Sequence, residues 1–183
     1  VAGLKWVASF PANLEHGINR ASAVIILNDS TTGFPYAILE AGKISAARTA
    51  ASAILAVDIL THSGLSESIG IIGCGRINFE VLRYLSVVRP NIKSVFLYDI
   101  EPVHANSFAC KISEAWNELS VEVFTELKDV ANRTQLISIA TTAMEPHILD
   151  NGTFKAGSLV LNLSLRDLSS EIILSSNNIV DDL

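Results

Sequence analysis

The sequence predicts an α/β protein: a doubly wound parallel sheet of the Rossmann type, preceded by part of a β-rich domain. After residue 66, apolar strand-like runs alternate with segments of helical spacing, which indicates a parallel sheet with crossover helices. The first of these runs ends in the glycine motif Gly73-Cys74-Gly75. Before residue 41, strand-like runs and turn residues prevail. These three observations set the expected fold class.

The first part of the chain shows the alternation of a half-buried strand. In the stretch LKWVASF, Leu4, Trp6 and Ala8 fall on one face and Lys5 on the other. Two more apolar strands are expected at 22–29 and 34–40, joined by the turn residues DSTTG. A long alanine-rich helix follows over 41–64, because alanine is the best helix former, and Gly64 is expected to end it.

The second part contains the strands of the parallel sheet. We expect strands at 68–73, 94–100, 121–125, 136–143 and 158–164, a sixth at 178–183, and helices at 76–88 and 104–119. The predicted domains are therefore residues 1–64, part of a substrate-binding and dimerisation domain with its connecting helix, and residues 65–183, a cofactor-binding Rossmann domain.

The glycine motif indicates a dinucleotide site, although Asn78 stands where the third glycine of G-x-G-x-x-G belongs. The first glycine makes the tight turn, the second lets the backbone approach the pyrophosphate, and the third only eases helix packing, so its loss is the most tolerable. Asp99 follows at close to the usual spacing of about 20 residues, and its carboxylate suits NAD rather than NADP. The predicted cofactor-binding residues are Gly73, Gly75, Arg76, Ile77, Asn78, Asp99, Thr141 and Thr142.

Four charged residues are candidates for the chemistry. Lys5 is either a solvated edge residue or an inward group at a site. Arg48, among small residues of a helix, suits a bidentate carboxylate contact, and Arg20 alone is ambiguous. Asp167 follows the fifth strand, where it is either a helix N-cap or a catalytic group. The four histidines show no ligand spacing, so no metal site is expected.

Composition narrows the class of protein. The 183 residues have a mean hydropathy of +0.39, a net charge of -6 and a sequence pI near 5.1. An acidic chain lacks the basic face that nucleic acid needs, and no uninterrupted apolar run suggests a membrane span. Two cysteines are too few for a disulfide framework, so a cytoplasmic setting is expected.

Six stretches together carry a resemblance to a known family: GLKWVASFPAN, RASAVIILND, SAARTAASAILA, GIIGCGRIN, ISIATTAMEPHI and NLSLRDL. They closely resemble the ornithine cyclodeaminase/mu-crystallin family over essentially the whole chain. Its members are longer, so we expect this chain to be a fragment. The resemblance implies NAD as cofactor, a homodimer, and an active site to which both domains contribute. It matches Lys5 and Asp167 to catalytic residues and Arg48 to the arginine that binds the substrate α-carboxylate.

Within the family, the motifs look most like the dehydrogenases of siderophore-type 2,3-diaminopropionate biosynthesis. This implies oxidation of N-(2-amino-2-carboxyethyl)-L-glutamate to an imine, which water splits into 2-oxoglutarate and L-2,3-diaminopropionate. Arg20 replaces the small hydroxyl residue of the cyclodeaminases and is expected to bind an additional substrate carboxylate. The alternatives are an ornithine cyclodeaminase, a ketimine reductase and a mu-crystallin-like binding protein. The segment around Asp167 departs from the glycine-rich cyclodeaminase version, which disfavours the lyase.

Overall fold

A computed structural model describes residues 2–61 and 67–180 of the chain. These residues form two compact units, Val1–Arg48 and Thr49–Leu183. The division falls inside a helix, after Arg48, whereas the sequence predicted a domain boundary after residue 64. The later half of that helix packs into the core of the second unit, which explains the difference. The roles given to the two domains stay predictions.

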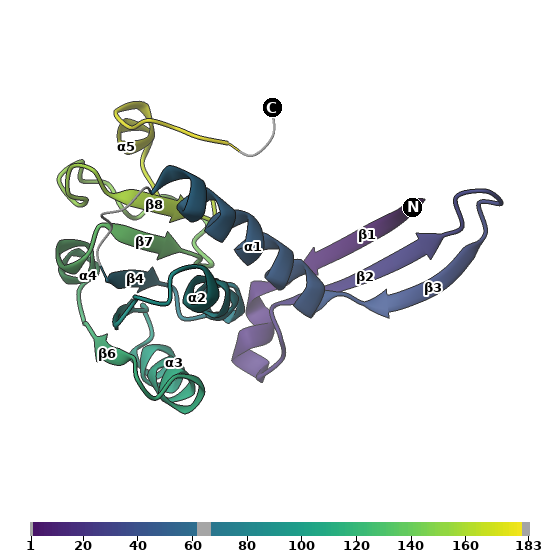
Figure 1. The fold of residues 1–183 in the computed structure, drawn as a ribbon, viewed down its shortest axis with the longest axis horizontal. Coiled ribbons are helices and arrows are strands. Elements are labelled where there is room, and N and C mark those ends of the chain that lie inside the picture. Colours follow the sequence, from purple (N-terminus) through teal and green to yellow (C-terminus); the bar gives the residue numbers. More distant parts are fainter. Residues whose placement is uncertain (1, 62–66, 181–183) are drawn as a thin grey trace. The chain divides into compact units, whose positions relative to one another are not determined.

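The first unit is built on a three-stranded antiparallel sheet in the order β1-β2-β3 (Figure 1). Its elements are β1 (Ala2–Ser9), the 3-10 helix η1 (Pro11–His16), β2 (Ala21–Asn28) and β3 (Pro35–Glu40). The three predicted strands are therefore confirmed. The turn between β2 and β3 closes on Asp29, whose carboxylate accepts hydrogen bonds from the backbone N–H groups of Thr31 and Thr32.

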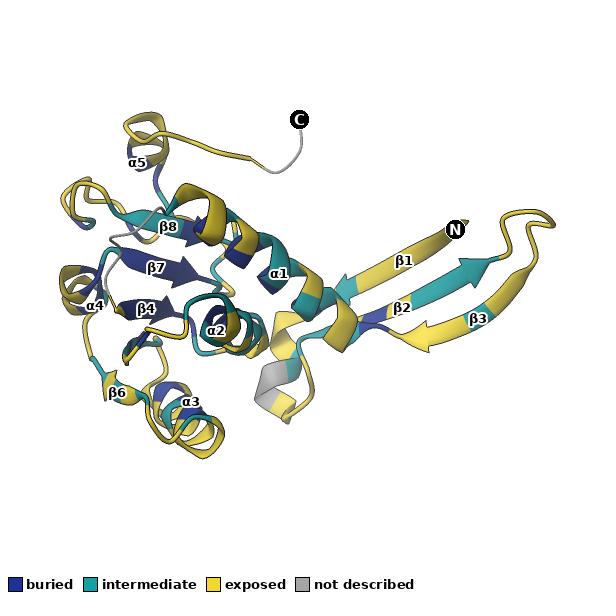
Figure 2. Ribbon diagram, viewed as in Figure 1, coloured by how far each residue is buried: buried dark blue, intermediate teal, exposed yellow. Residues whose placement is uncertain are grey.

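Strand β1 is much more exposed than its alternating sequence predicted. The side chains of Leu4 and Trp6 are 59% and 73% exposed, and the strand contains no buried residue. Alternation separates the two faces of a strand without specifying what covers either of them. Figure 2 shows the same exposure along β1 and β3, whereas β2 is partly buried.

Helix α1 (Gly42–Leu60) follows β3 and crosses the division between the units. Its later turns present one stripe of small and branched side chains at helical spacing, Ala50, Ala53, Ile54 and Val57, to the core of the second unit. The helix ends at Leu60. Gly64, which was expected to end it, lies outside the described residues.

The second unit contains the predicted parallel sheet, with five strands in the order β6-β5-β4-β7-β8 (Figure 1). The strands are β4 (Ser68–Ile72), β5 (Ser94–Tyr98), β6 (Ser120–Val123), β7 (Leu136–Ile139) and β8 (Leu159–Asn162). The helices are α2 (Arg76–Val88), α3 (Pro102–Ala115), α4 (Leu127–Arg133) and α5 (Ser170–Leu174). The α/β fold class is confirmed, and strand order reverses between β4 and β7.

Two apolar clusters cover the two faces of this sheet. Ile69 and Ile71 of β4 join the cluster formed with α1, α2 and α3. Ile72 points to the opposite face and joins the cluster with Ala131 of α4 and Ile172 of α5. Because both faces are covered, β4 and β7 are entirely buried (Figure 2). This explains the continuous apolar runs of the sequence.

Three local expectations change. The short helix α4 was not predicted, and α5 was considered only as the helix that Asp167 could cap. Residues 178–180 are not in a strand, and 181–183 of the expected sixth strand lie outside the described residues. Finally, Asp167 does not cap α5, because the hydroxyl of Ser169 accepts the capping hydrogen bond from the N–H of Ile172 at 3.3 Å. The described helices include none long and apolar enough to cross a membrane.

Candidate functional site

The glycine loop lies at the carboxyl end of β4, where ligands bind in open parallel sheets. Gly73 has φ +88°, and a Cβ there would lie 2.4 Å from the carbonyl oxygen of Ala140, so only glycine fits. Gly75 is the N-cap of α2, and a Cβ added to it would meet nothing within 4 Å. The loop thus makes a tight turn at Gly73 and leaves open space at Gly75, beside the helix N-terminus.

Asn78 explains how the loop is held without a third glycine. Its side chain is wholly buried in the first turn of α2. The amide group donates to the carbonyl oxygens of Ile72 at 3.1 Å and Gly73 at 2.7 Å. The hydroxyl of Ser138 in β7 donates to the amide oxygen at 2.7 Å. Asn78 therefore fixes the loop to its own strand and to the next one. A contact between Asn78 and a cofactor stays a prediction.

Asp99 follows β5 and is anchored to the same loop. Its Oδ2 accepts the backbone N–H of Cys74 at 2.7 Å, and its Oδ1 accepts that of Glu101 at 3.0 Å. Nδ1 of His104 lies 3.6 Å from Oδ1. Burial, and then the Asp99 carboxylate, raise the pKa of the Cys74 thiol to about 12. The two features that predicted a dinucleotide site, the glycine loop and the acid, are thus joined by a hydrogen bond at Cys74, between the two glycines.

A second group of polar side chains gathers around the carboxylate of Asp167. We call Asp167 and its neighbours Thr141, Ser164 and His147 the Asp167 cluster. The residue is wholly buried, and the hydroxyls of Thr141 and Ser164 donate short hydrogen bonds to its two oxygens. The backbone N–H of Thr141 donates to the Ser164 hydroxyl at 3.0 Å. Nδ1 of His147 lies 3.9 Å from Oδ1 of Asp167. These contacts hold a carboxylate at the carboxyl ends of β7 and β8.

The loop that carries Asp167 is strained at one residue. Leu165 has φ +66°, the left-handed region that non-glycine residues rarely adopt, and its side chain is 77% exposed. The bend lies between Ser164 and Asp167, which form one of the short hydrogen bonds of the cluster. Strain of this kind is concentrated at functional sites.

In the first unit, Lys5 contacts helix α1, and Arg48 lies in the same helix. Nζ of Lys5 donates to the hydroxyl of Ser45 at 3.3 Å. Arg48 lies one turn further along the helix, on the side of Ser45, because residues three apart are neighbours on a helix surface. The structure thus associates both predicted residues with the first turns of α1.

Arg20 lies directly before β2, and its carbonyl oxygen accepts the N–H of Phe10 at 2.8 Å. It stands at the end of the sheet where β3 leads into α1, since Glu40 pairs with Val24. Among the side chains that the structure describes, no ion pair is recorded for Arg20 or Arg48. Neither guanidinium group is therefore recorded against a carboxylate of the described part of the chain.

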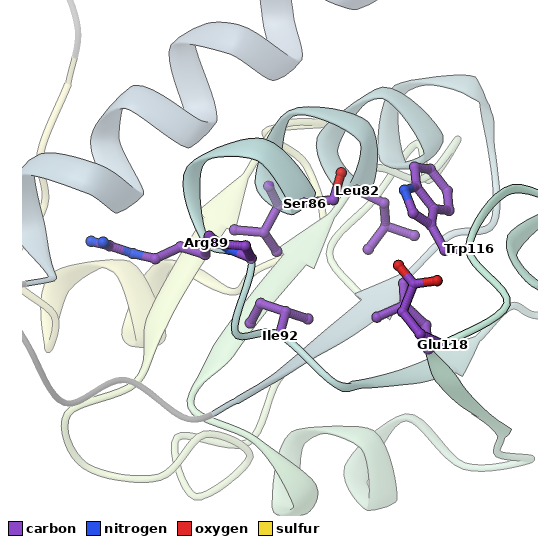
Figure 3. Close-up of a pocket in the computed structure, with 9 residues that line it drawn as sticks. Leu82, Ser86, Arg89, Ile92, Trp116 and Glu118 are labelled. Atoms are coloured by element: carbon purple, nitrogen blue, oxygen red, sulfur yellow. The ribbon is translucent and has the colours of Figure 1, made fainter.

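The hollow shown in Figure 3 lies elsewhere on the second unit. It is lined by residues of α2 and by residues directly before β5 and β6, including Leu82, Ile92, Trp116 and Glu118. These residues precede the strands, whereas the glycine loop and Asp167 follow theirs, so the hollow belongs to the opposite edge of the sheet. In the described part of the chain, no group of three His, Cys, Asp or Glu side chains could hold a metal ion.

Sequence reasoning missed Ser138, Ser164 and His147. Ser164 carries a local signal, since it precedes Asp167 by three residues in the same loop. Ser138 and His147 carry none, because their partners come from other strands and depend on the strand order. Thr142, which was predicted to line the cofactor cleft, is exposed.

The class of protein follows from this edge of the sheet. A glycine turn at the start of a helix, with an acid at the end of the neighbouring strand, is the arrangement of a dinucleotide-binding α/β domain. The chain belongs to the ornithine cyclodeaminase/mu-crystallin family, whose sequence profile matches residues 1–181.

Several relatives are similar over the whole chain. N-((2S)-2-amino-2-carboxyethyl)-L-glutamate dehydrogenase of Staphylococcus aureus is 29% identical over 183 residues, which are 100% of this chain and 54% of the relative. Alanine dehydrogenase of Archaeoglobus fulgidus is 30% identical over 186 residues, 100% of this chain and 56% of the relative. The chain thus spans about half the length of these curated relatives.

A solved structure agrees with the fold of the chain. Δ1-pyrroline-2-carboxylate reductase of Thermococcus litoralis, in complex with NADH and L-proline, superposes with a TM-score of 0.86 at 30% identity. The match covers 95% of this chain and 54% of that one.

Proposed function

We propose that the protein is an NAD-dependent dehydrogenase that oxidises N-(2-amino-2-carboxyethyl)-L-glutamate to an imine, which water splits into 2-oxoglutarate and L-2,3-diaminopropionate. The observation that carries the proposal is the pair of arginines, Arg20 and Arg48, which have no recorded ion pair in the described residues. A substrate with several carboxylates needs more than one such cation. The similarity to the Staphylococcus aureus enzyme supports the same substrate.

The residues present fit NAD. The space at Gly75 lets a pyrophosphate approach the backbone N–H groups of α2, and the anchored carboxylate of Asp99 has lone pairs for the ribose hydroxyls. The negative charge of Asp99 disfavours the 2′-phosphate of NADP. When bound, NAD supplies the hydride acceptor for the reaction. Loss of preference for NAD over NADP in Asp99→Ala would support this assignment.

The remaining steps are assigned to side chains of the protein. Arg48 binds the α-carboxylate of the substrate, and Arg20 binds a carboxylate of the glutamate part, so that the reacting carbon is held in one orientation. Asp167 takes the proton that the substrate nitrogen loses before oxidation. Lys5, held by Ser45, stabilises negative charge that develops on the substrate or on the attacking water.

The direct test uses the natural full-length protein with NAD and N-(2-amino-2-carboxyethyl)-L-glutamate, L-ornithine or L-proline. NADH absorbance and released 2-oxoglutarate are followed together. We expect equal amounts of NADH and 2-oxoglutarate from the first substrate only. Proline and ammonia from L-ornithine without net NADH would show a cyclodeaminase and contradict the proposal.

The role of Arg20 is tested in the same assay. Arg20→Ala is expected to raise KM for N-(2-amino-2-carboxyethyl)-L-glutamate by about tenfold or more, because a charge-assisted hydrogen bond contributes about 1.5–3 kcal/mol. The matched control is Arg83→Ala, since Arg83 is engaged by Glu80 on the surface of α2. Unchanged KM and kcat in Arg20→Ala would exclude Arg20 from substrate binding.

A reductase is the second candidate, favoured by the similarity to the pyrroline-2-carboxylate reductase structure. It would run the hydride step towards the amine with the same cofactor site. Oxidation of NADH with Δ1-pyrroline-2-carboxylate, and no NADH formation from N-(2-amino-2-carboxyethyl)-L-glutamate, would favour this candidate.

A further inference from the structure

We propose that His147 is the proton relay of the site: it removes the proton that Asp167 takes and passes it to solvent. The inference rests on the proposed function for its reaction, and on the Asp167 cluster for its geometry. His147 follows β7 and Asp167 follows β8, and these strands are neighbours in the sheet. No local feature of the sequence predicted this pair.

Asp167 cannot exchange a proton with solvent by itself. The residue is 0% exposed, and both carboxylate oxygens already accept hydrogen bonds from the hydroxyls of Thr141 and Ser164. A proton that arrives at this carboxylate must therefore leave through a neighbouring group. A hydroxyl can transmit a proton but does not take up positive charge near neutral pH.

His147 is the neighbour with the required properties. Its Nδ1 lies 3.9 Å from Oδ1 of Asp167, and its side chain is 39% exposed, so it has access to both the carboxylate and water. Histidine changes its charge between pH 5 and 8.

The backbone fixes this pairing. The N–H groups of His147 and Ile148 donate to the carbonyl oxygen of Asp167 at 3.1 Å and 2.9 Å. Ile148 also forms a parallel bridge with Leu168. The two loops are thus joined at the residues that carry the imidazole and the carboxylate, which keeps the side chains adjacent.

Other charged groups stand nearby in the sequence. Glu145 and Arg166 are exposed on the same two loops, and Glu171 lies in the first turn of α5. Nη1 of Arg166 is directed to the sulfur of Met144 at 3.6 Å. Among the residues that the structure describes, Asp167 is the one charged group with a recorded contact to the His147 side chain.

The proton balance of the reaction agrees with a relay. Oxidation of the protonated secondary amine by NAD, followed by addition of water, yields the oxo acid, the protonated primary amine, NADH and one proton. In our proposal the proton of the substrate nitrogen reaches the buried Asp167 carboxylate through the partly buried hydroxyl of Ser164, which donates its own proton to Oδ2 and takes up that of the substrate. The protonated Asp167 gives it to neutral His147, which restores the carboxylate, and the imidazolium releases it to water.

The kinetic test measures kcat and KM against pH for the wild type, His147→Asn and the control Glu145→Gln, which removes a charge from the same loop. We expect His147→Asn to lower kcat by about 10²-fold with little change in KM, and to lose the limb of the profile that the imidazole contributes. Added imidazole should restore part of the rate. Wild-type kcat and an unchanged profile in His147→Asn would overturn the relay.

The pairing itself is tested without turnover. Ring ¹⁵N NMR signals of histidine-labelled protein are compared between the wild type and Asp167→Asn, with His147→Asn to assign the signal. Asp167→Asn is expected to move the His147 signals and leave those of His16 in place. Unmoved His147 signals would overturn the pairing. If the wild type oxidises none of the substrates, the proposed function fails, while this comparison still decides whether His147 and Asp167 are coupled.

Discussion

The hydroxyl of Ser138 donates a hydrogen bond of 2.7 Å to the side-chain amide oxygen of Asn78, deep between β7 and α2. The amide nitrogen of Asn78 meanwhile satisfies the carbonyl oxygens of Ile72 and Gly73. The buried residue in place of the third glycine therefore holds the glycine loop in position through its hydrogen bonds. Close helix packing, for which that glycine normally serves, is here replaced by a hydrogen-bonded network.

Restoring the third glycine should damage the protein. Asn78→Gly removes the recorded partner of the Gly73 carbonyl oxygen and of the Ser138 hydroxyl, and it puts glycine inside a helix. The carbonyl oxygen of Ile72 keeps its hydrogen bond from the N–H of Ala140. We expect a loss of about 2–3 kcal/mol in the free energy of unfolding and weaker NADH binding. Urea unfolding measures the first and NADH fluorescence the second. Ser138→Ala should cost about 1 kcal/mol, and the two losses should not add in the double variant. Wild-type stability in Asn78→Gly would contradict the role of Asn78 in stabilising the glycine loop.

Alanine substitutions at the two loop glycines should have different effects. Gly73→Ala forces a Cβ against the carbonyl oxygen of Ala140 at a positive φ, so we expect about 2 kcal/mol or more of destabilisation. Gly75→Ala meets no atom within 4 Å, so it should cost only the difference between glycine and alanine as N-cap residues, about 1 kcal/mol or less. Its methyl group would nevertheless stand where a pyrophosphate approaches, and NADH affinity should fall. Full NADH affinity in Gly75→Ala would remove the pyrophosphate from this loop.

Most of the second unit could be predicted from the sequence because its signals are local. Apolar runs bounded by turns predicted β4, β5, β7 and β8, and the glycines and Asp99 stand at strand ends where the motif requires them. The partners of these residues could not be predicted in the same way. Ser138 meets Asn78, and His147 meets Asp167, only because β7 lies between β4 and β8.

In the first unit, the sequence predicted the strands but not their burial. Leu4 and Lys5 lie on different faces of β1, as predicted, because successive residues of a strand point to opposite sides, and Lys5 contacts Ser45. Both side chains are nevertheless exposed, Leu4 to 59%. The predicted burial of one face of β1 is not observed, because the alternation of a strand carries no information on what packs against either face.

The thiol of Cys74 should be chemically inert. Burial, and then the nearby Asp99 carboxylate, raise its pKa to about 12, so the reactive thiolate is scarce at pH 8. Cys110 is exposed on α3. Iodoacetamide at pH 8, followed by mass spectrometry of the peptides, should modify Cys110 and leave Cys74 intact. Equal labelling of both cysteines in the folded protein would contradict the assigned environment.

The same shift makes stability depend on pH in the alkaline range. The native protein keeps the Cys74 proton above pH 9, whereas the unfolded chain loses it near the ordinary pKa of 9.0. The unfolded state therefore binds fewer protons, and the contribution of this group to stability should decrease from pH 9 towards pH 12. Cys74→Ser should remove that part of the alkaline dependence in urea unfolding at several pH values.

Leu165 supplies the last prediction, because its strain can be relieved without touching the Asp167 cluster. Its φ of +66° costs a non-glycine residue about 1–2 kcal/mol, while glycine adds about 0.5–1 kcal/mol of unfolded-state entropy. Leu165→Gly should therefore raise the free energy of unfolding by about 0.5–1 kcal/mol, since the exposed leucine side chain contributes little packing. The control is Leu149→Gly at another exposed leucine, which should not stabilise the protein. A destabilised Leu165→Gly variant would mean that the leucine, rather than the backbone bend, holds Ser164 and Asp167 together.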